Sequence, residues 1–168
     1  MPLRLTTWLV LLLALIGASN PSWADVLIGK VVGLADGDTV TVLDEQKQQH
    51  KIRLAGIDAP ERKQPYADAS RKHLASLVFG KTVEVRFHKK DRYGRLVGTV
   101  YLEGSDVNLL QVTAGLAWHY KAYEKEQSEQ ERLVYASAEE TARRRHLGLW
   151  QDRTPVPPWD FRKAAKVR

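Results

Sequence analysis

The sequence predicts a mainly β domain of the α+β class, in which five strands and three α-helices enclose one core. Three short segments near the start have the alternation and β-branched content of strands, with polar or glycine-containing turns between them. A helical segment separates them from two further strands, and two more helical segments follow. Five strands with a helix inserted after the third is the order expected of a five-stranded OB-fold β-barrel.

The expected strands lie on either side of the first expected helix. They cover residues 26–32, 38–43, 51–57, 82–88 and 95–102. The helix begins after Pro65, and its apolar side chains recur at the spacing of one helical face. It should stop at Gly80.

Two further helices are expected after the last strand. The first covers residues 106–114, with Asp106 near its start and Gly115 just past its end. The second covers residues 125–146, because acidic side chains fill its first turns and Arg and His its last, which complements the helix dipole. Gly148 can serve as its C-terminal cap.

The chain ends are expected to lie outside a single domain that covers residues 25–153. Residues 1–24 have the pattern of a signal peptide, in which Arg4 precedes an apolar run and cleavage follows Ala24. The apolar run is shorter than a membrane-spanning helix needs, so no stable membrane anchor is expected. A retained anchor is the less favoured alternative to cleavage. The protein should therefore be secreted or periplasmic.

The C-terminal segment, residues 154–168, is expected to be an extended tail. Its first part contains three prolines, which cannot continue a helix. We expect the tail to lie against the domain surface, with Trp159 and Phe161 as its anchors.

The composition indicates a partner that carries negative charge. The formal net charge is +6, and loss of the leader would remove only the charge of Arg4. A basic protein binds polyanions through counterion release, so nucleic acid is the first candidate. Anionic envelope polymers and membrane surfaces would satisfy the same electrostatics. The chain has no cysteine, which is compatible with export but does not require it.

Three clusters of polar residues lie at the ends of expected strands. They are Asp36-Gly37-Asp38-Thr39, the segment from Arg53 to Asp58-Ala59-Pro60-Glu61, and Asp91-Arg92-Tyr93-Gly94-Arg95. Two carboxylates brought together from adjacent strands, Asp38 and Asp58, would repel each other unless a cation lay between them. Hard oxygen ligands of this kind suit calcium or magnesium.

The remaining charged groups of the clusters suit phosphate chemistry. Glu61 follows Asp58 closely, and Pro60 can hold its carboxylate beside a metal ion, where it could take a proton from water. Arg53 and Arg95 form paired hydrogen bonds to phosphate and stay charged. Each cluster alone is weak evidence, because it is better explained as a turn between strands, so their order and content together carry the inference.

These motifs resemble those of the staphylococcal nuclease (thermonuclease) family across the chain from Val32 to Trp150. The resemblance includes the three clusters and also Val107-Asn108, Gly115-Leu116-Ala117 and Gly148-Leu149-Trp150. It implies a five-stranded OB barrel with three helices that hydrolyses phosphodiester bonds of DNA or RNA.

The resemblance also implies roles for individual residues. A calcium ion is expected on Asp38, Asp58 and the main-chain carbonyl of Ala59, with Asp36 in the outer shell. Glu61 is the expected general base. Arg53 and Arg95 are expected to stabilise the phosphorane-like transition state, and the cleaved ends should carry a 3′-phosphate.

The chain departs from the family pattern around the expected base-stacking wall. The loop after Glu61 is shorter than in the best-known family member, and Lys121 aligns with a stacking tyrosine of that protein. Tyr123 aligns with the second aromatic of the wall, and Tyr93 can lie beside a sugar, base or phosphate. We therefore expect Tyr93, Tyr123 and Lys121 to bind substrate, with single strands favoured.

Two other functions agree with part of the sequence. OB folds often bind single strands without cutting them, and a basic envelope-associated structural protein would explain the charge and the leader. Neither uses all of the polar clusters, so an endonuclease that acts as a monomer is the preferred interpretation.

Overall fold

The structure is a computed structural model, and it describes residues 25–166. The signal peptide expected at residues 1–24 lies outside the described residues. Eight strands are assigned in this range: β1 Asp25–Leu34, β2 Thr39–Leu43, β3 Gln49–Leu54, β4 Ile57–Asp58, β5 Thr82–Lys90, β6 Leu96–Leu102, β7 Ser105–Asp106 and β8 Trp118–His119. The helices are α1 Ala67–Val78, α2 Val107–Thr113, η1 Lys121–Glu126, α3 Glu129–Arg144, η2 Gly148–Gln151 and α4 Pro158–Lys166.

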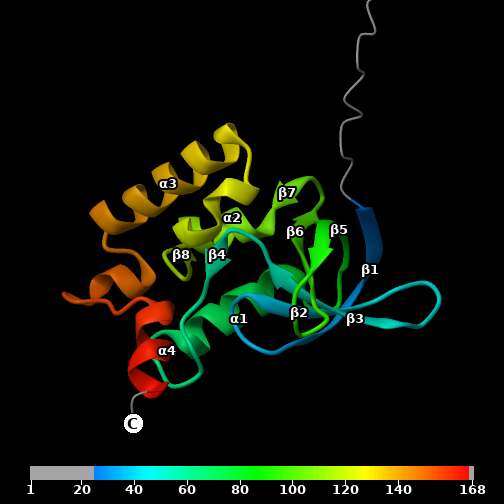
Figure 1. Ribbon diagram of the computed structural model, residues 1–168, viewed down its shortest axis with the longest axis horizontal. Coiled ribbons are helices and arrows are strands. Elements are labelled where there is room, and N and C mark those ends of the chain that lie inside the picture. The colour runs from blue at the N-terminus through cyan, green and yellow to red at the C-terminus, as the bar shows by residue number, and fades with distance from the viewer. Residues whose placement is uncertain (1–24, 167–168) are drawn as a thin grey trace, which may run out of the picture.

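Five strands close into a barrel, as the sequence predicts. The sheet has the order β3-β2-β1-β5-β6, with β7 added beyond β6, and β3 also pairs with β6. The closing β3–β6 pair is parallel, whereas the neighbouring pairs along the sheet are antiparallel. The protein is therefore a mixed five-stranded OB-fold barrel with helices outside it (Figure 1).

The barrel interior is filled by the inward-facing side chains of its strands. Its fully buried members include Val31, Val42, Ile52, Leu54, Val85 and Val100. Leu74 and Val78 of α1 and Val107 and Val112 of α2 pack into the same cluster. Both helices thus present an apolar face to one core. The apolar spacing predicts α1, whereas the residues at its two ends predict α2.

The third expected helix is shorter than predicted and is preceded by a separate 3-10 turn. Ser128 caps α3 in a capping box with Glu131, so the helix begins after that residue. The preceding segment forms η1 instead. At the other end α3 stops at Arg144, and His146 and Gly148 both adopt positive φ.

The prediction of a wholly extended C-terminal tail is wrong. Residues 155–157 have no regular structure, but α4 follows them and begins with Pro158. Proline is well suited to the first position of a helix, where its missing N–H is not needed. Asp160 in the first turn and Lys163 and Lys166 in the last turn favour the helix further.

A second, smaller cluster attaches α4 to the domain. Trp118, Ala142, Leu149 and Trp150 are buried there, and Trp159 packs against them. The Trp159 ring lies 5.6 Å from Trp118 and stacks on Tyr120 at 5.2 Å with an interplanar angle of 8°. Trp159 is therefore an anchor as predicted, although it anchors a helix. Among residues 25–166, no helix combines the length and apolar character needed to cross a membrane.

Candidate active site

One cavity of about 640 Å³ gathers residues from the strand ends and from α4. Its walls include nine residues singled out from the sequence: Asp36, Asp38, Arg53, Asp58, Ala59, Glu61, Tyr93, Arg95 and Tyr123. Barrel closure brings them together, because Thr39 lies opposite Arg53 in the β2–β3 pair and Arg53 lies opposite Val97 in the β3–β6 pair.

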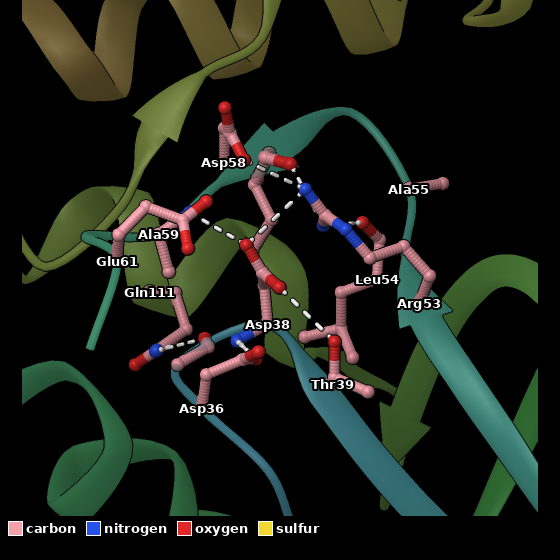
Figure 2. Close-up of polar contacts among 12 residues, drawn as sticks. Asp36, Asp38, Thr39, Arg53, Leu54, Ala55, Asp58, Ala59, Glu61 and Gln111 are labelled. Carbon is pink, nitrogen blue, oxygen red and sulfur yellow. Dashed lines mark hydrogen bonds and ion pairs between the residues drawn. The ribbon is translucent and has the colours of Figure 1, made fainter. Parts of the chain in front are cut away.

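Arg53 joins the two carboxylates expected to hold a cation (Figure 2). Its Nη2 lies 2.9 Å from Oδ1 of Asp58 and 3.2 Å from Oδ2 of Asp38. Its Nη1 donates to the main-chain oxygens of Leu54 and Ile57, at 2.9 and 3.0 Å. The guanidinium is thus oriented by four groups, and its position depends on the turn between β3 and β4.

The loop that carries Asp36 and Asp38 is held from two sides. The amide N–H of Ala59 donates to Oδ2 of Asp38 at 2.6 Å, and the amide N–H of Asp38 donates to Asp36 at 3.1 Å. Behind the loop, the buried Gln111 of α2 donates to the main-chain oxygen of Gly37 at 2.7 Å. These contacts fix Asp38 relative to the segment that follows β4.

The two central carboxylates are almost completely buried. Asp38 is 4% exposed and Asp58 is 1% exposed. Burial raises the pKa of Asp38 to about 7 against the lowering effect of Arg53, and the nearby Asp36 and Asp58 add to the rise. Two buried carboxylates with one shared guanidinium form an environment that favours an additional cation.

Glu61 lies beside this pair rather than within it. Figure 2 shows Glu61 and Arg53 on either side of Asp38 and Asp58. The backbone N–H of Glu61 donates to the side chain of Gln64 at 2.8 Å, and Gln64 in turn donates to the main-chain oxygen of Val156 at 3.0 Å. The segment that carries Glu61 is therefore tied to the chain just before α4.

Arg162 of α4 is a residue of this site that the sequence analysis missed. Its Nη1 donates to Glu61 at 2.7 Å and to Oδ1 of Asp58 at 3.2 Å, and its Nη2 donates to Oδ2 of Asp58 at 2.8 Å. The hydrogen bonds to Asp58 first, and to Glu61 second, raise the pKa of this guanidinium, and partial burial opposes the rise. The helix signals around Pro158 could have indicated α4, but no local pattern indicates its contacts.

The remaining predicted residues fall into two groups. Arg95 lines the cavity, but its guanidinium pairs with Asp91 at 2.7 Å. Tyr93 and Tyr123 line the cavity and are exposed, as a surface that stacks on bases would require. Lys121 does not line this cavity. Its ammonium pairs with the buried Glu139 at 2.7 Å, beside a smaller neighbouring hollow.

The geometry suits a cation held by few protein ligands. Within residues 25–166, no group of three or more His, Cys, Asp or Glu side chains has the arrangement of a metal site. The expected ligand set contains only two carboxylates, Asp38 and Asp58, with a main-chain carbonyl. Such all-oxygen sites leave positions for water and substrate and suit calcium or magnesium.

Comparison with known proteins places this arrangement in one family. Residues 51–152 match the model of a family described as staphylococcal nuclease homologue. An uncharacterized endonuclease of Escherichia coli O157:H7 is 45% identical over 135 residues, which cover 80% of this chain and 84% of that protein. A micrococcal nuclease of Shigella flexneri is 40% identical, covering 88% and 87%. An uncharacterized endonuclease of Haemophilus influenzae is 38% identical, covering 82% and 74%.

Proposed function

Because the chain belongs to the staphylococcal nuclease family, we propose that it is an endonuclease that hydrolyses phosphodiester bonds of DNA or RNA with the help of calcium. The observation that carries this proposal is the position of Arg53, which contacts both Asp38 and Asp58 beside Glu61 in one open cavity. This combination supplies carboxylates for a cation, a base and a phosphate-binding group within reach of one substrate.

The calcium ligands are Asp38, Asp58 and the main-chain carbonyl of Ala59 in this proposal, with Asp36 in the outer shell. The chemistry of the ligand set supports calcium, because its oxygen donors are hard and two of them are buried carboxylates. When bound, the ion would neutralise a phosphate oxygen and favour ionisation of water.

The protein's own groups would then carry the proton and the developing charge. Glu61 takes a proton from the attacking water, whose oxygen bonds to phosphorus as the bond to the 5′-oxygen breaks, and the leaving 5′-oxygen takes a proton from solvent. Arg53 holds the phosphate as its negative charge grows, and Arg95 assists the leaving oxygen. The products are a 3′-phosphate and a 5′-hydroxyl.

The substrate would lie along the exposed wall of the cavity. Tyr93 and Tyr123 offer aromatic faces on which unpaired bases stack, which favours single strands. Lys89 lies over the Tyr123 ring at 5.4 Å and pairs with Glu126 on the same wall. Lys121 would contact substrate only beyond this wall, because its ammonium faces Glu139.

We also propose that the protein is exported as a monomer to a secreted or periplasmic location. The proposal rests on the signal-peptide pattern of residues 1–24. Cleavage after Ala24 would leave the described strand β1, from Asp25 to Leu34, intact. N-terminal sequencing of the protein recovered from the periplasm and medium tests this, and an intact Met1 would contradict it.

The nuclease proposal is tested with purified protein and single-stranded DNA, in calcium and in calcium with excess chelator. Cleavage should require calcium and fall by about 10² or more in Glu61→Gln, which removes the base and keeps the side-chain shape. Glu45→Gln, an exposed carboxylate in the β2–β3 turn, is the matched control. Unimpaired turnover of Glu61→Gln would defeat the assignment of the base. Binding without cleavage would indicate a binding module instead.

A further inference from the structure

The C-terminal helix α4 places a positive charge on the same carboxylates that the proposed function assigns to calcium. Arg162 contacts both oxygens of Asp58 and also Glu61, with its shortest contact at 2.7 Å. These residues lie more than a hundred positions apart in sequence. The contact is therefore a product of where α4 packs.

Two attachments hold α4 in this position. Trp159 stacks on Tyr120 and contacts Trp118 edge-on, and Gln64 donates to the main-chain oxygen of Val156 just before the helix. Beyond these attachments much of the helix surface is exposed, and Lys163 pairs with Asp160 of its own helix. The ion pairs of Arg162 thus connect a peripheral helix directly to the centre of the site.

Arg162 occupies hydrogen-bonding capacity of Asp58 that a cation would need. Oδ1 of Asp58 accepts from both Arg53 and Arg162, and Oδ2 accepts from Arg162. A carboxylate oxygen has two lone-pair directions, so three of the four directions on Asp58 are taken. A divalent cation on Asp58 would also be repelled by a guanidinium held on the same oxygens.

We propose that Arg162 is an internal competitor of the cation and determines how tightly the site binds calcium. This inference rests on the proposed function, because it takes Asp58 as a ligand. In the metal-free protein Arg162 balances the charge of Asp58 and Glu61. Calcium binding displaces it, releases the ionic contact of α4 and leaves a guanidinium at the rim of the cavity. Because Arg162 must be displaced, the site binds calcium more weakly than the same carboxylates would without Arg162.

The experiment measures binding of calcium chloride alone to the full mature protein by calorimetry, without nucleic acid. Arg162→Gln should bind calcium roughly five- to tenfold more tightly than the wild type, the size expected for loss of a partly exposed ionic competitor. Lys163→Gln removes the same charge from the same helix without touching the carboxylates, and it should stay within about twofold. Arg162→Lys keeps the charge but not the paired contacts, so its calcium affinity should lie between those of Arg162→Gln and Lys163→Gln.

A second measurement follows α4 directly by hydrogen exchange. Calcium should speed exchange in residues 158–166 of the wild type, whereas Arg162→Gln should exchange quickly there with and without calcium. Exchange that slows on calcium binding would contradict displacement.

The remaining outcomes also decide the inference. Unchanged or weaker calcium binding in Arg162→Gln overturns it and leaves the nuclease proposal intact if the wild type still cleaves in calcium. Calcium binding to none of the proteins overturns it together with the calcium assignment. Cleavage is measured separately from calcium binding, with and without chelator. Failure of the nuclease proposal can therefore be distinguished from failure of the proposed role of Arg162.

Discussion

The side-chain amide of Gln111 donates to the main-chain oxygen of Gly37 across 2.7 Å, and so ties α2 to the loop between Asp36 and Asp38. The same Nε2 lies 3.2 Å from the main-chain oxygen of Ser70 in α1, and the Gln111 oxygen contacts His73. Gln111 is completely buried. One amide therefore positions the loop of a proposed calcium ligand against two helices.

Replacing Gln111 with Leu should weaken both the fold and the site. The substitution leaves the buried oxygen of Gly37 without the Gln111 donor, which costs about 1–3 kcal/mol in the free energy of unfolding. Urea unfolding measures this, and calcium affinity should fall as well. Thr113→Val, on the exposed side of the same helix, should change stability by less than about 0.5 kcal/mol. Equal effects of the two substitutions would contradict the role of Gln111.

Replacing Gly37 with Ala should distort the same loop. A Cβ at this position would lie 1.8 Å from Oγ of the buried Ser70, so the loop must shift. Overpacking of this kind costs about 1–3 kcal/mol, and cleavage should fall because Asp38 moves with the loop. Gly33→Ala is the control, since its Cβ would meet Thr41 at an ordinary 3.5 Å. Thermal unfolding and cleavage rates of both variants check the prediction.

Replacing Arg53 with Lys should reduce cleavage by about a hundredfold at saturating calcium, the usual effect of losing a preorganised donor to a developing charge. Lysine keeps the positive charge but cannot contact Asp58, Leu54 and Ile57 at once. Single-turnover rates measure the loss. Arg144→Lys on the exposed face of α3 should leave the rate unchanged. A fully active Arg53→Lys enzyme would show that cleavage does not need the several donors of a planar guanidinium.

The N-cap of α2 should make stability depend on pH. Asp106 accepts from Leu109 and from the hydroxyl of Tyr135, at 3.0 and 2.7 Å, yet burial raises its pKa. A carboxyl with a raised pKa in the folded protein contributes stability that is present below its unfolded pKa, about 3.9, and is lost as pH rises through the folded pKa.

Asp106→Asn tests this dependence, because an asparagine oxygen can accept the same bonds without titrating. Relative to Asp106→Asn, the wild type should lose free energy of unfolding as the pH rises from about 4. Denaturant titrations at several pH values measure the difference. A wild-type advantage that grows with pH would show that Asp106 ionises more readily in the folded protein.

Local signals in the sequence were sufficient for most of the fold. The alternating strands, the cap at Asp106 and the apolar faces of α1 and α2 depend on neighbours within a few residues. The same holds for the turn clusters, since their carboxylates and arginines lie within or directly beside the ends of strands. Helix α4 has local signals too, with Pro158 at its first position, but the prolines of the same segment predict an extended chain.

What the sequence by itself determined was the barrel, its inserted helix and the set of polar clusters, because periodicity and turn chemistry act over short distances. Only the tertiary structure decided which side chains meet. It turned Lys121 toward Glu139 and delivered Arg162 to Asp58. Contacts with partners that far away in sequence depend on how helices pack on the barrel, and no local pattern encodes that packing.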